Sequence, residues 1–195
     1  GAIGLRVVEL FRALGLRAVA VTAHPSPERA TAAGLDWLGG PGRDDLQELL
    51  RRADVAVLAV PREAATEGLI GPAELAALGP AGILVNVSRG PVVQEQPLYE
   101  ALRDGGIAGA AIDVWWRYPK TADLQWRPST APFWELENVV LTPHSAGLSH
   151  SMWQGRWDLT VRQLRAVAAV PRLAAELAEV LVPTTRPTPL PTTQG

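Results

Sequence analysis

The stretch that most constrains the fold of this 195-residue chain runs from Asp54 to Val60 and is apolar after its first residue. Such a composition is typical of a strand buried on both faces of a parallel sheet. Short apolar runs of the same kind end at Val21, Asn86 and Val114, and stretches with helical periodicity lie between them. Strands that alternate with helices predict an α/β fold with a parallel sheet covered on both faces.

The same reasoning places the other elements. We expect helices over residues 2–14, 44–52, 94–104, 147–170 and 173–181, strands over 16–21, 54–60, 82–86, 108–114 and 139–141, a helical turn within 25–34, and loops at 39–42, 63–78 (with helical turns, broken by Gly71-Pro72) and 115–137. Gly15 is expected to end the first helix. Asp44 or Asp45 is expected to cap the helix after Gly42.

Composition excludes several classes of function. The net charge of −2 provides no basic field for nucleic acid. The chain has no cysteine, which excludes disulfides and thiolate metal sites, and we expect no bound metal. Arg6, Glu9, Arg12 and Arg17 interrupt the apolar opening residues, so these form neither a signal peptide nor a membrane span. A reducing cytoplasm is the default location.

Arg89 lies just past the strand that ends at Asn86, within the segment Asn86-Val87-Ser88-Arg89-Gly90-Pro91. Open α/β sheets bind their ligands at this carboxyl edge. A guanidinium there can hold a carboxylate through two parallel hydrogen bonds. From the residues alone, Arg89 could equally cover a helix end or pair with Glu95 or Asp104.

A pair of glycines stands at the mouth of the first helix, in Gly1-Ala2-Ile3-Gly4. They fit the second and third glycines of the G-x-G-x-x-G motif, whose helix N-terminus holds a pyrophosphate. The first glycine and the strand before it would then lie upstream of residue 1. The pair fits equally a helix start with flexible glycines.

Three segments in this order and spacing resemble the D-isomer-specific 2-hydroxyacid dehydrogenases: NVSRGPVV at 86–93, GIAGAAIDV at 106–114 and NVVLTPH at 138–144. The resemblance covers roughly residues 1–165. It implies a Rossmann-like doubly wound parallel sheet that binds NAD or NADP. It further implies hydride transfer between nicotinamide and a small D-2-hydroxy or 2-keto acid, and a homodimer in the full-length protein. A non-catalytic NAD(H)-binding sensor or interaction module is the alternative.

The resemblance also implies the roles of individual residues. Arg89 would bind the substrate carboxylate and polarise the carbonyl, and His144 would be the general acid/base. Asp113 would hydrogen-bond the nicotinamide carboxamide. The other cofactor-binding residues would be Gly1, Ala2, Ile3, Gly4, His24, Pro61, Val87, Ser88 and Ser145. We expect His150 to be exposed on the following helix.

Two positions depart from the family. Tyr118 stands where the family has the glutamate that orients the catalytic histidine. Either Glu135 or Glu137 substitutes in space, or Tyr118 orients the ring, or catalysis is impaired. The strand ending at Val21 is followed by Thr22-Ala23-His24-Pro25 rather than an acid, so nothing repels a 2′-phosphate and NADP is as plausible as NAD. His24 could receive that phosphate with Ser26 and Arg29, or be a surface turn residue.

The family's first strand and its substrate domain have no counterpart here. In the strand order 3-2-1-4-5-6 the first strand is central, so its loss divides the sheet into two halves. We therefore expect a fragment of marginal stability and little turnover. We expect residues 1–170 to be the nucleotide-binding domain, incomplete at its N-terminus, 171–182 a C-terminal helix remnant, and 183–195 a disordered Pro/Thr-rich tail.

Overall fold

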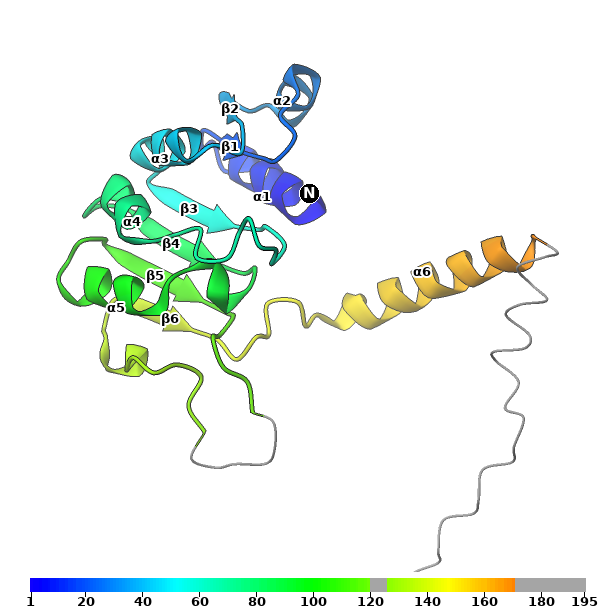
Figure 1. Ribbon diagram of the computed structural model, residues 1–195. Coiled ribbons are helices and arrows are strands. Elements are labelled where there is room, and N and C mark those ends of the chain that lie inside the picture. The colour runs from blue at the N-terminus through cyan, green and yellow to red at the C-terminus, as the bar shows by residue number, and fades with distance from the viewer. Residues whose placement is uncertain (120–125, 171–195) are drawn as a thin grey trace, which may run out of the picture. The chain divides into compact units, whose positions relative to one another are not determined.

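The computed structural model describes residues 1–119 and 126–170. The chain divides into two compact units, residues 1–146 and the segment that begins at Gly147. Figure 1 labels the α-helices and strands. The elements are α1 (Ala2–Ala13), β1 (Val19–Val21), α2 (Pro27–Ala33), β2 (Trp37–Gly39), α3 (Arg43–Arg52), β3 (Val55–Leu58), α4 (Pro72–Leu78), β4 (Ile83–Asn86), η1 (Gly90–Val92), α5 (Glu95–Arg103), β5 (Gly109–Ile112), η2 (Phe133–Glu135), β6 (Val139–Leu141) and α6 (His150–Ala168).

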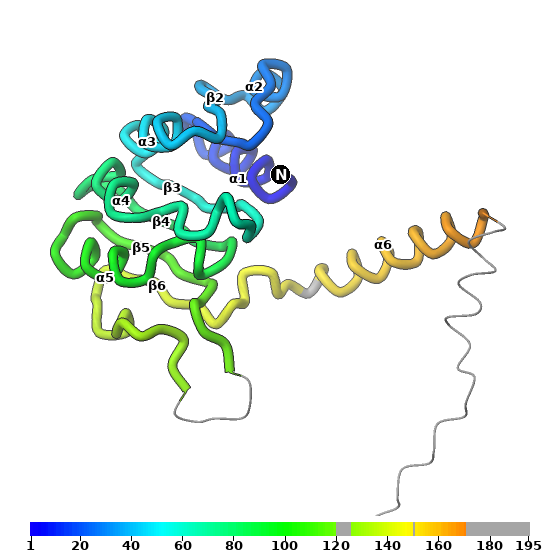
Figure 2. Tube along the Cα trace, in the orientation of Figure 1, coloured from blue at the N-terminus to red at the C-terminus, as the bar shows by residue number. Residues whose placement is uncertain are grey.

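All strands pair in parallel, in two separate sheets. The smaller sheet pairs β1 with β2, and the larger has the order β3-β4-β5-β6. Figure 2 follows the chain through these four strands in sequence order. The predicted α/β class and the division of the sheet into two halves are confirmed. The strand β2 was not predicted.

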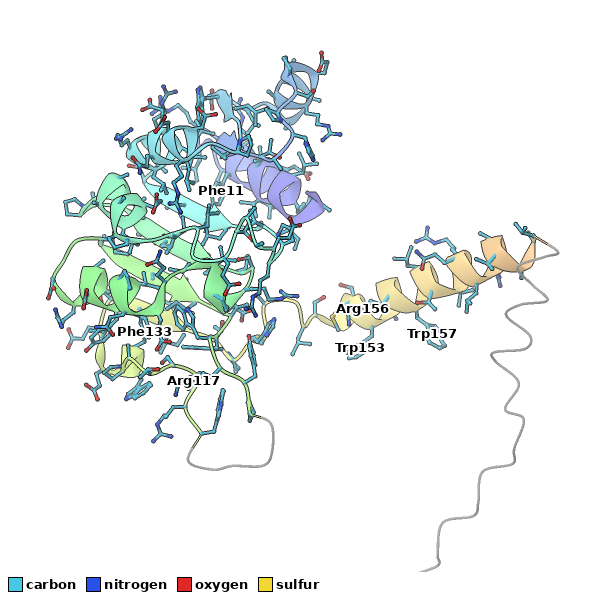
Figure 3. All side chains as sticks on the ribbon, viewed as in Figure 1. Phe11, Arg117, Phe133, Trp153, Arg156 and Trp157 are labelled. Atoms are coloured by element: carbon cyan, nitrogen blue, oxygen red, sulfur yellow. The ribbon has the colours of Figure 1, made fainter. Side chains whose placement is uncertain are left out.

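One face of the larger sheet forms the hydrophobic core. The strands present alternate side chains to it, among them Ala56 and Leu84 on neighbouring strands. Helices α4 and α5 contribute leucines to the same cluster, and Phe133 is fully buried within it. Trp116 stacks on Phe133 with ring centroids 5.3 Å apart. Figure 3 labels Phe133 beneath α5. The core therefore lies between this face of the sheet and helices α4 and α5.

The opposite face of this sheet is much less covered. Val55 and Ile83 are exposed, and Val140 is 64% exposed. The prediction that the strand at 54–60 is buried on both faces is therefore wrong. An apolar composition shows that both faces of a strand could be buried. Burial on both faces also requires that another element packs against each of them.

The helix ends partly follow the sequence signals. Gly15 has a φ of +79° and ends α1, with the Leu16 amide donating to the Phe11 carbonyl as in a Schellman motif. The prediction that Asp44 or Asp45 caps α3 is wrong. Gly42 is the N-cap of this helix, and no side chain forms a capping hydrogen bond. Asp45 instead accepts a hydrogen bond from the Gly40 amide, since its carboxylate reaches back to the preceding loop.

Other boundaries need correction. Pro72 begins α4 as its first residue rather than breaking a segment, since a proline at that position loses no helical hydrogen bond. The region predicted as a loop at 115–137 contains the short helix η2.

Exposed Trp153 and Trp157 project from one side of α6 (Figure 3). The predicted helix over 173–181 and tail over 183–195 lie outside the described residues, and the domain boundary at 170 stays a prediction.

Glu74 joins α4 to α3 although it is only 2% exposed. Its carboxylate accepts hydrogen bonds from the Arg43 guanidinium at 2.9 Å, the Gly71 amide at 3.1 Å and the Gln47 side chain at 3.4 Å. Burial opposes ionisation of Glu74, but these hydrogen bonds outweigh it and lower its pKa below the ordinary value. The buried carboxylate is therefore ionised and paired.

We predict that Glu74→Gln lowers the free energy of unfolding by about 2 kcal/mol at pH 7, because it removes a charged acceptor from three donors. The folded-state pKa of Glu74 is depressed, so its contribution is present above the unfolded-state pKa near 4.5 and is lost as the pH falls through the folded-state pKa. Urea unfolding of the variant should therefore depend less on pH below about 4.5.

The matched control is Glu48→Gln on α3, whose ion pairs with Arg51 and Arg52 are exposed. This change should leave the stability nearly unchanged. Equal losses in the two variants would contradict the role given to Glu74.

At Gly90 the loop after β4 approaches the backbone of the loop after β5. A β-carbon at Gly90 would lie 2.3 Å from the carbonyl atoms of Trp115 and 2.6 Å from the Trp116 amide nitrogen. These neighbours are backbone atoms, which cannot yield as a flexible side chain can. Only glycine permits this approach.

We predict that Gly90→Ala lowers the free energy of unfolding by about 2 kcal/mol, because the two loops must move apart. Gly155→Ala in α6 is the control, since its β-carbon meets nothing within 4 Å. That change should stabilise the helix by about 0.5–1 kcal/mol. Unfolding followed by circular dichroism measures both, and a Gly90→Ala protein as stable as the parent would rule out the close packing.

Candidate functional site

Three loops leave the larger sheet at the same edge. Asn86, Ile112 and Leu141 are register neighbours on β4, β5 and β6. The ladder continues past the strands, with the Asp113 amide donating to the Asn86 carbonyl at 3.1 Å and the Thr142 amide to the Ile112 carbonyl at 3.0 Å. Adjacent strands lie about 4.8 Å apart, so β4 and β6 are separated by about 10 Å with β5 between them.

The loop after β4 is folded by the Asn86 side chain, which is 2% exposed. Its Oδ1 accepts from the Ser88 amide at 3.1 Å and the Ser88 hydroxyl at 2.9 Å, and its Nδ2 donates to the Arg89 carbonyl at 3.1 Å. The buried amide thus fixes the backbone that carries Arg89. Sequence reasoning gave Asn86 no role, although an asparagine at a strand end followed by a serine signals this turn.

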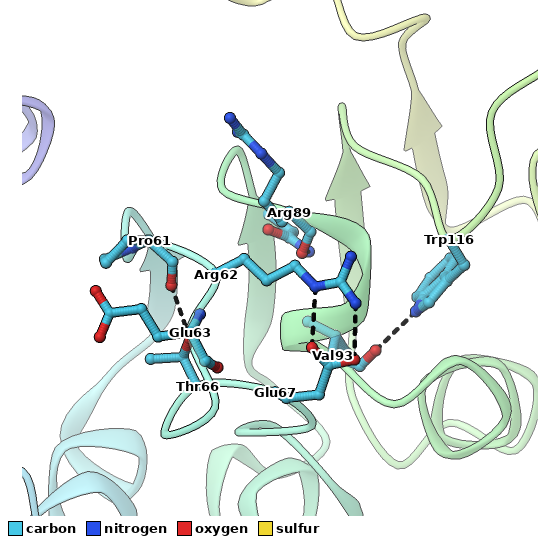
Figure 4. A network of polar contacts seen from close by, with 9 residues as sticks. Pro61, Arg62, Glu63, Thr66, Glu67, Arg89, Val93 and Trp116 are labelled. Atoms are coloured by element: carbon cyan, nitrogen blue, oxygen red, sulfur yellow. Dashed lines mark hydrogen bonds and ion pairs between the residues drawn. The ribbon is translucent and has the colours of Figure 1, made fainter.

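The Arg89 side chain is exposed, and its guanidinium donates to the neighbouring Ser88 carbonyl at 2.6 Å. Among the described residues it forms no ion pair. The two alternative partners are engaged elsewhere. Glu95 accepts from the Thr130 and Ala131 amides, and Asp104 pairs with Arg103 at 2.7 Å. Figure 4 shows Arg89 beside the loop that follows β3.

The loop after β6 is folded by Asp113, which is 5% exposed. Its Oδ1 accepts from the Thr142 hydroxyl at 2.6 Å, the Ser145 amide at 2.8 Å and the Ala146 amide at 3.1 Å, and its Oδ2 also accepts from Ala146 at 3.1 Å. Burial opposes ionisation, but these donors outweigh it and lower the pKa of Asp113.

His144 lies within the turn that Asp113 closes, and its φ of +58° is left-handed. Non-glycine residues rarely adopt that conformation, which persists only where the surroundings impose it. Here the carboxylate of Asp113 binds the chain on both sides of His144, at Thr142 and Ser145. The ring is exposed at the sheet edge. His144 does not cap a helix, because α6 begins only at His150.

Tyr118 contacts the imidazole of His144. Its Oη lies 2.9 Å from His144 Nδ1 and also accepts from the Trp115 amide at 3.1 Å. Glu135 and Glu137 are exposed, and within the described residues neither hydrogen-bonds His144. Of the alternatives left open by the sequence, the geometry brings Tyr118 to the ring.

Two tryptophans, Trp115 and Trp116, anchor the segment that carries Tyr118 through hydrogen bonds from their indole nitrogens. The Trp115 indole donates to the Thr142 carbonyl at 3.0 Å, and the Trp116 indole donates to the Val93 carbonyl at 2.7 Å. Trp115 thereby ties the loop after β5 to the end of β6. Trp116 ties the same loop to the segment after β4 (Figure 4).

Pro61 is exposed in the loop after β3. The Thr66 hydroxyl donates to the Pro61 carbonyl at 2.7 Å, and Arg62 and Glu67 pair through two hydrogen bonds of 2.9 and 3.1 Å (Figure 4). This loop leaves β3 at the same edge as the loop of Arg89, since β3 and β4 pair in parallel. Val87 is half-buried and Ser88 buried on the neighbouring loop.

The remaining expected cofactor residues lie on other elements. Gly1 caps α1, whose first residues Ala2, Ile3 and Gly4 are at least partly exposed. His24 is exposed after β1, and Ser26 caps α2 by accepting from the Arg29 amide at 3.2 Å. Across the described ranges, no hydrogen bond or ion pair joins these residues to those that follow β4, β5 and β6. Ser145 belongs to the turn of Asp113.

Two further observations concern classes excluded above. Within residues 1–119 and 126–170, no cluster of histidine, aspartate and glutamate has the arrangement of a metal site. No helix in those ranges combines the length and apolar character needed to cross a membrane.

Comparisons with known proteins cover most of the chain. The family of D-isomer specific 2-hydroxyacid dehydrogenases, NAD binding domain, matches residues 1–146. D-3-phosphoglycerate dehydrogenase of Methanocaldococcus jannaschii is 32% identical over 93% of this chain and 31% of its own length. Glyoxylate reductase of Thermococcus kodakarensis is 32% identical over 85% of this chain and 46% of its own. The chain spans about half or less of such relatives, from 25% to 54%.

Solved structures agree. An NADPH-dependent glyoxylate/hydroxypyruvate reductase from Sinorhizobium meliloti, in complex with NADP and malonate, superposes with a TM-score of 0.66 at 32% identity over 87% of this chain and 48% of that one. D-lactate dehydrogenase with NAD+ from Lactobacillus jensenii gives 0.72 at 28% identity over 87% and 50%. With the segments around Arg89, Asp113 and His144 at one sheet edge, the chain belongs to the NAD-binding domains of the D-isomer specific 2-hydroxyacid dehydrogenases.

Proposed function

We propose that the complete gene product is an NAD(P)-dependent oxidoreductase that interconverts a small D-2-hydroxy acid and its 2-keto acid. The observation that carries the proposal is the pairing of a guanidinium and an imidazole at one sheet edge. Arg89 and His144 follow β4 and β6, the strands on either side of β5, and Asp113 comes directly after β5. A separation of about 10 Å between the two outer strands leaves room for one small acid between the side chains.

Arg89 would bind the substrate carboxylate and polarise the reacting carbonyl. Its guanidinium forms no ion pair within the described part of the chain, so a ligand carboxylate does not compete with an internal one. The malonate in the Sinorhizobium meliloti relative is consistent with an anionic ligand. As negative charge develops on the carbonyl oxygen during reduction, a fixed cation beside it stabilises the transition state more than the ground state.

His144 would exchange the proton with the 2-hydroxyl. Tyr118 occupies Nδ1, so Nε2 is the nitrogen left to face a substrate. In reduction Nε2–H donates its proton to the oxygen of the former carbonyl, and in oxidation Nε2 takes the hydroxyl proton. An imidazole can both donate and accept a proton at Nε2, so one histidine serves both directions.

The residues present fit a nicotinamide dinucleotide, which supplies or accepts the hydride when bound. The first amides of α1 have no partner within the helix and favour an anion, and no atom within 4 Å would meet a β-carbon at Gly1 or Gly4. The pyrophosphate can thus approach this backbone. Among the described residues, one donor, the Ala146 amide, binds Asp113 Oδ2, which leaves this oxygen capacity for the carboxamide of the nicotinamide.

Ser88, Val87, Ser145 and Pro61 would border the nicotinamide and adenosine. We propose NAD or NADP as the cofactor, with His24 beside the adenosine ribose. Relatives solved with NADP and with NAD+ support both. A homodimer and a cytoplasmic location are further proposals. The non-catalytic sensor is not favoured, because the relatives are named as dehydrogenases and reductases.

We predict that Arg89→Ala and His144→Ala each lower kcat/KM for a 2-keto acid by about 10²–10⁴, because each removes a charge or proton donor used in the transition state. The assay offers glyoxylate, pyruvate and hydroxypyruvate to the complete gene product, with NADH and with NADPH.

Arg103→Ala is the matched control, since that arginine pairs with Asp104 on the surface of α5 and should not affect the rate. Unchanged rates in Arg89→Ala and His144→Ala would show that the two residues have other roles.

A further inference from the structure

Tyr118 Oη is within hydrogen-bonding distance of two nitrogens, the amide nitrogen of Trp115 and Nδ1 of His144. The Trp115 amide can only donate, so the phenol oxygen accepts that hydrogen bond at 3.1 Å. The oxygen keeps one lone pair and its own hydrogen for His144 Nδ1 at 2.9 Å. The hydroxyl can therefore accept from Nδ1–H or donate to a bare Nδ1. A carboxylate in this place could only accept.

We infer that Tyr118 is the positioning residue of His144, a role that rests on the proposed function. When Nδ1 carries a proton, it donates to Tyr118, and the lone pair of Nε2 is free to act as a base. When the ring is fully protonated, the same contact persists and Nε2–H is available to the substrate oxygen. Because the hydroxyl is neutral, it fixes the orientation of the ring without stabilising the imidazolium by a full charge.

The backbone that precedes Tyr118 is held at two residues. Its neighbour Arg117 donates through its amide to the Pro128 carbonyl at 3.1 Å and through its guanidinium to the Thr130 hydroxyl at 2.6 Å. Three residues before Tyr118, the Trp115 indole donates to the Thr142 carbonyl at 3.0 Å. The phenol thus reaches His144 from a fixed segment, although the side chain itself is half exposed.

Among the described residues, Asp113 is a charged group close enough to interact with the imidazole of His144. Asp113, at the end of β5, attracts the charged ring, but its carboxylate is already bound by Thr142, Ser145 and Ala146. Arg89, after β4, carries a positive charge, whose effect on the ring is opposite in sign to that of Asp113. A carboxylate at position 118 would add a second attraction at Nδ1. It should therefore raise the pH at which the ring loses its proton.

The first test observes the ring directly by nitrogen-15 NMR in the complete gene product. Residues 1–195 contain three histidines, and His144→Gln identifies the signals of His144 among these and any others in the complete gene product. Tyr118→Phe removes the partner of Nδ1 and should change the Nδ1 shift and the tautomer ratio of His144 alone. The chain has one other tyrosine, and Tyr99→Phe is the matched control that should change neither. Unchanged His144 signals in Tyr118→Phe would overturn the inference.

The second test asks whether Tyr118 acts through His144. Tyr118→Phe should lower kcat about tenfold with little change in KM, and it should have no further effect in the His144→Ala background. Tyr118→Glu should retain kcat and move the limb of the pH profile that reports the protonated ring upward by about one pH unit. Equal losses in both backgrounds, or a Tyr118→Glu profile that does not move, would contradict a positioning role.

The two tests separate the inference from the function on which it rests. If His144→Ala is fully active, the proposed function fails, while the NMR signals still decide whether Tyr118 holds the ring. If His144→Ala is inactive and Tyr118→Phe matches the parent in rate and in NMR, only the positioning role fails.

Discussion

The buried carboxylate of Asp113 is the interaction on which the sheet edge depends. It gathers a hydroxyl and two backbone amides from the chain just after β6, and so closes the turn that carries His144 in a left-handed conformation. An isolated chain would leave that conformation, since it is costly for a residue with a β-carbon. The hydrogen bonds to the carboxylate thus stabilise the strained turn and fix the position of the exposed imidazole.

The loop after β4 is also held by a buried polar side chain, that of Asn86. Asn86 ends β4 as Asp113 follows β5, and its buried amide folds the next three residues around itself. Each of the two loops is therefore shaped by a buried polar side chain at the carboxyl end of a strand. Gly90 and Trp115 then lock the loops against one another. The positions of Arg89 and His144 are therefore set by residues at the strand ends, Asn86 and Asp113, rather than by contacts within the loops.

Much of this arrangement could be predicted from sequence. The apolar strands and amphipathic helices set the parallel sheet, and the segments around Arg89, Asp113 and His144 identified the family before any coordinates. The division into two sheets also followed, because strand order places the missing strand at the centre. These features are local in sequence or follow from the known order of the fold.

What could not be predicted depends on contacts between distant segments. The strand β2 is a three-residue run beside a glycine-rich loop and is defined only by its pairing with β1. Whether Tyr118 or a distant glutamate meets His144 is decided across 26 residues of chain, where no local pattern applies. The exposure of Val140 likewise depends on what packs against the sheet.

The most direct test of this account is hydrogen exchange at the Ser145 and Ala146 amides, measured by NMR in the parent and in Asp113→Asn. Both amides donate to Asp113, so the account predicts that they are protected in the parent and exchange at least about tenfold faster in the variant, while amides of the β4–β5 ladder are unaffected. Equal protection of Ser145 and Ala146 in the two proteins would show that the turn of His144 forms without the carboxylate.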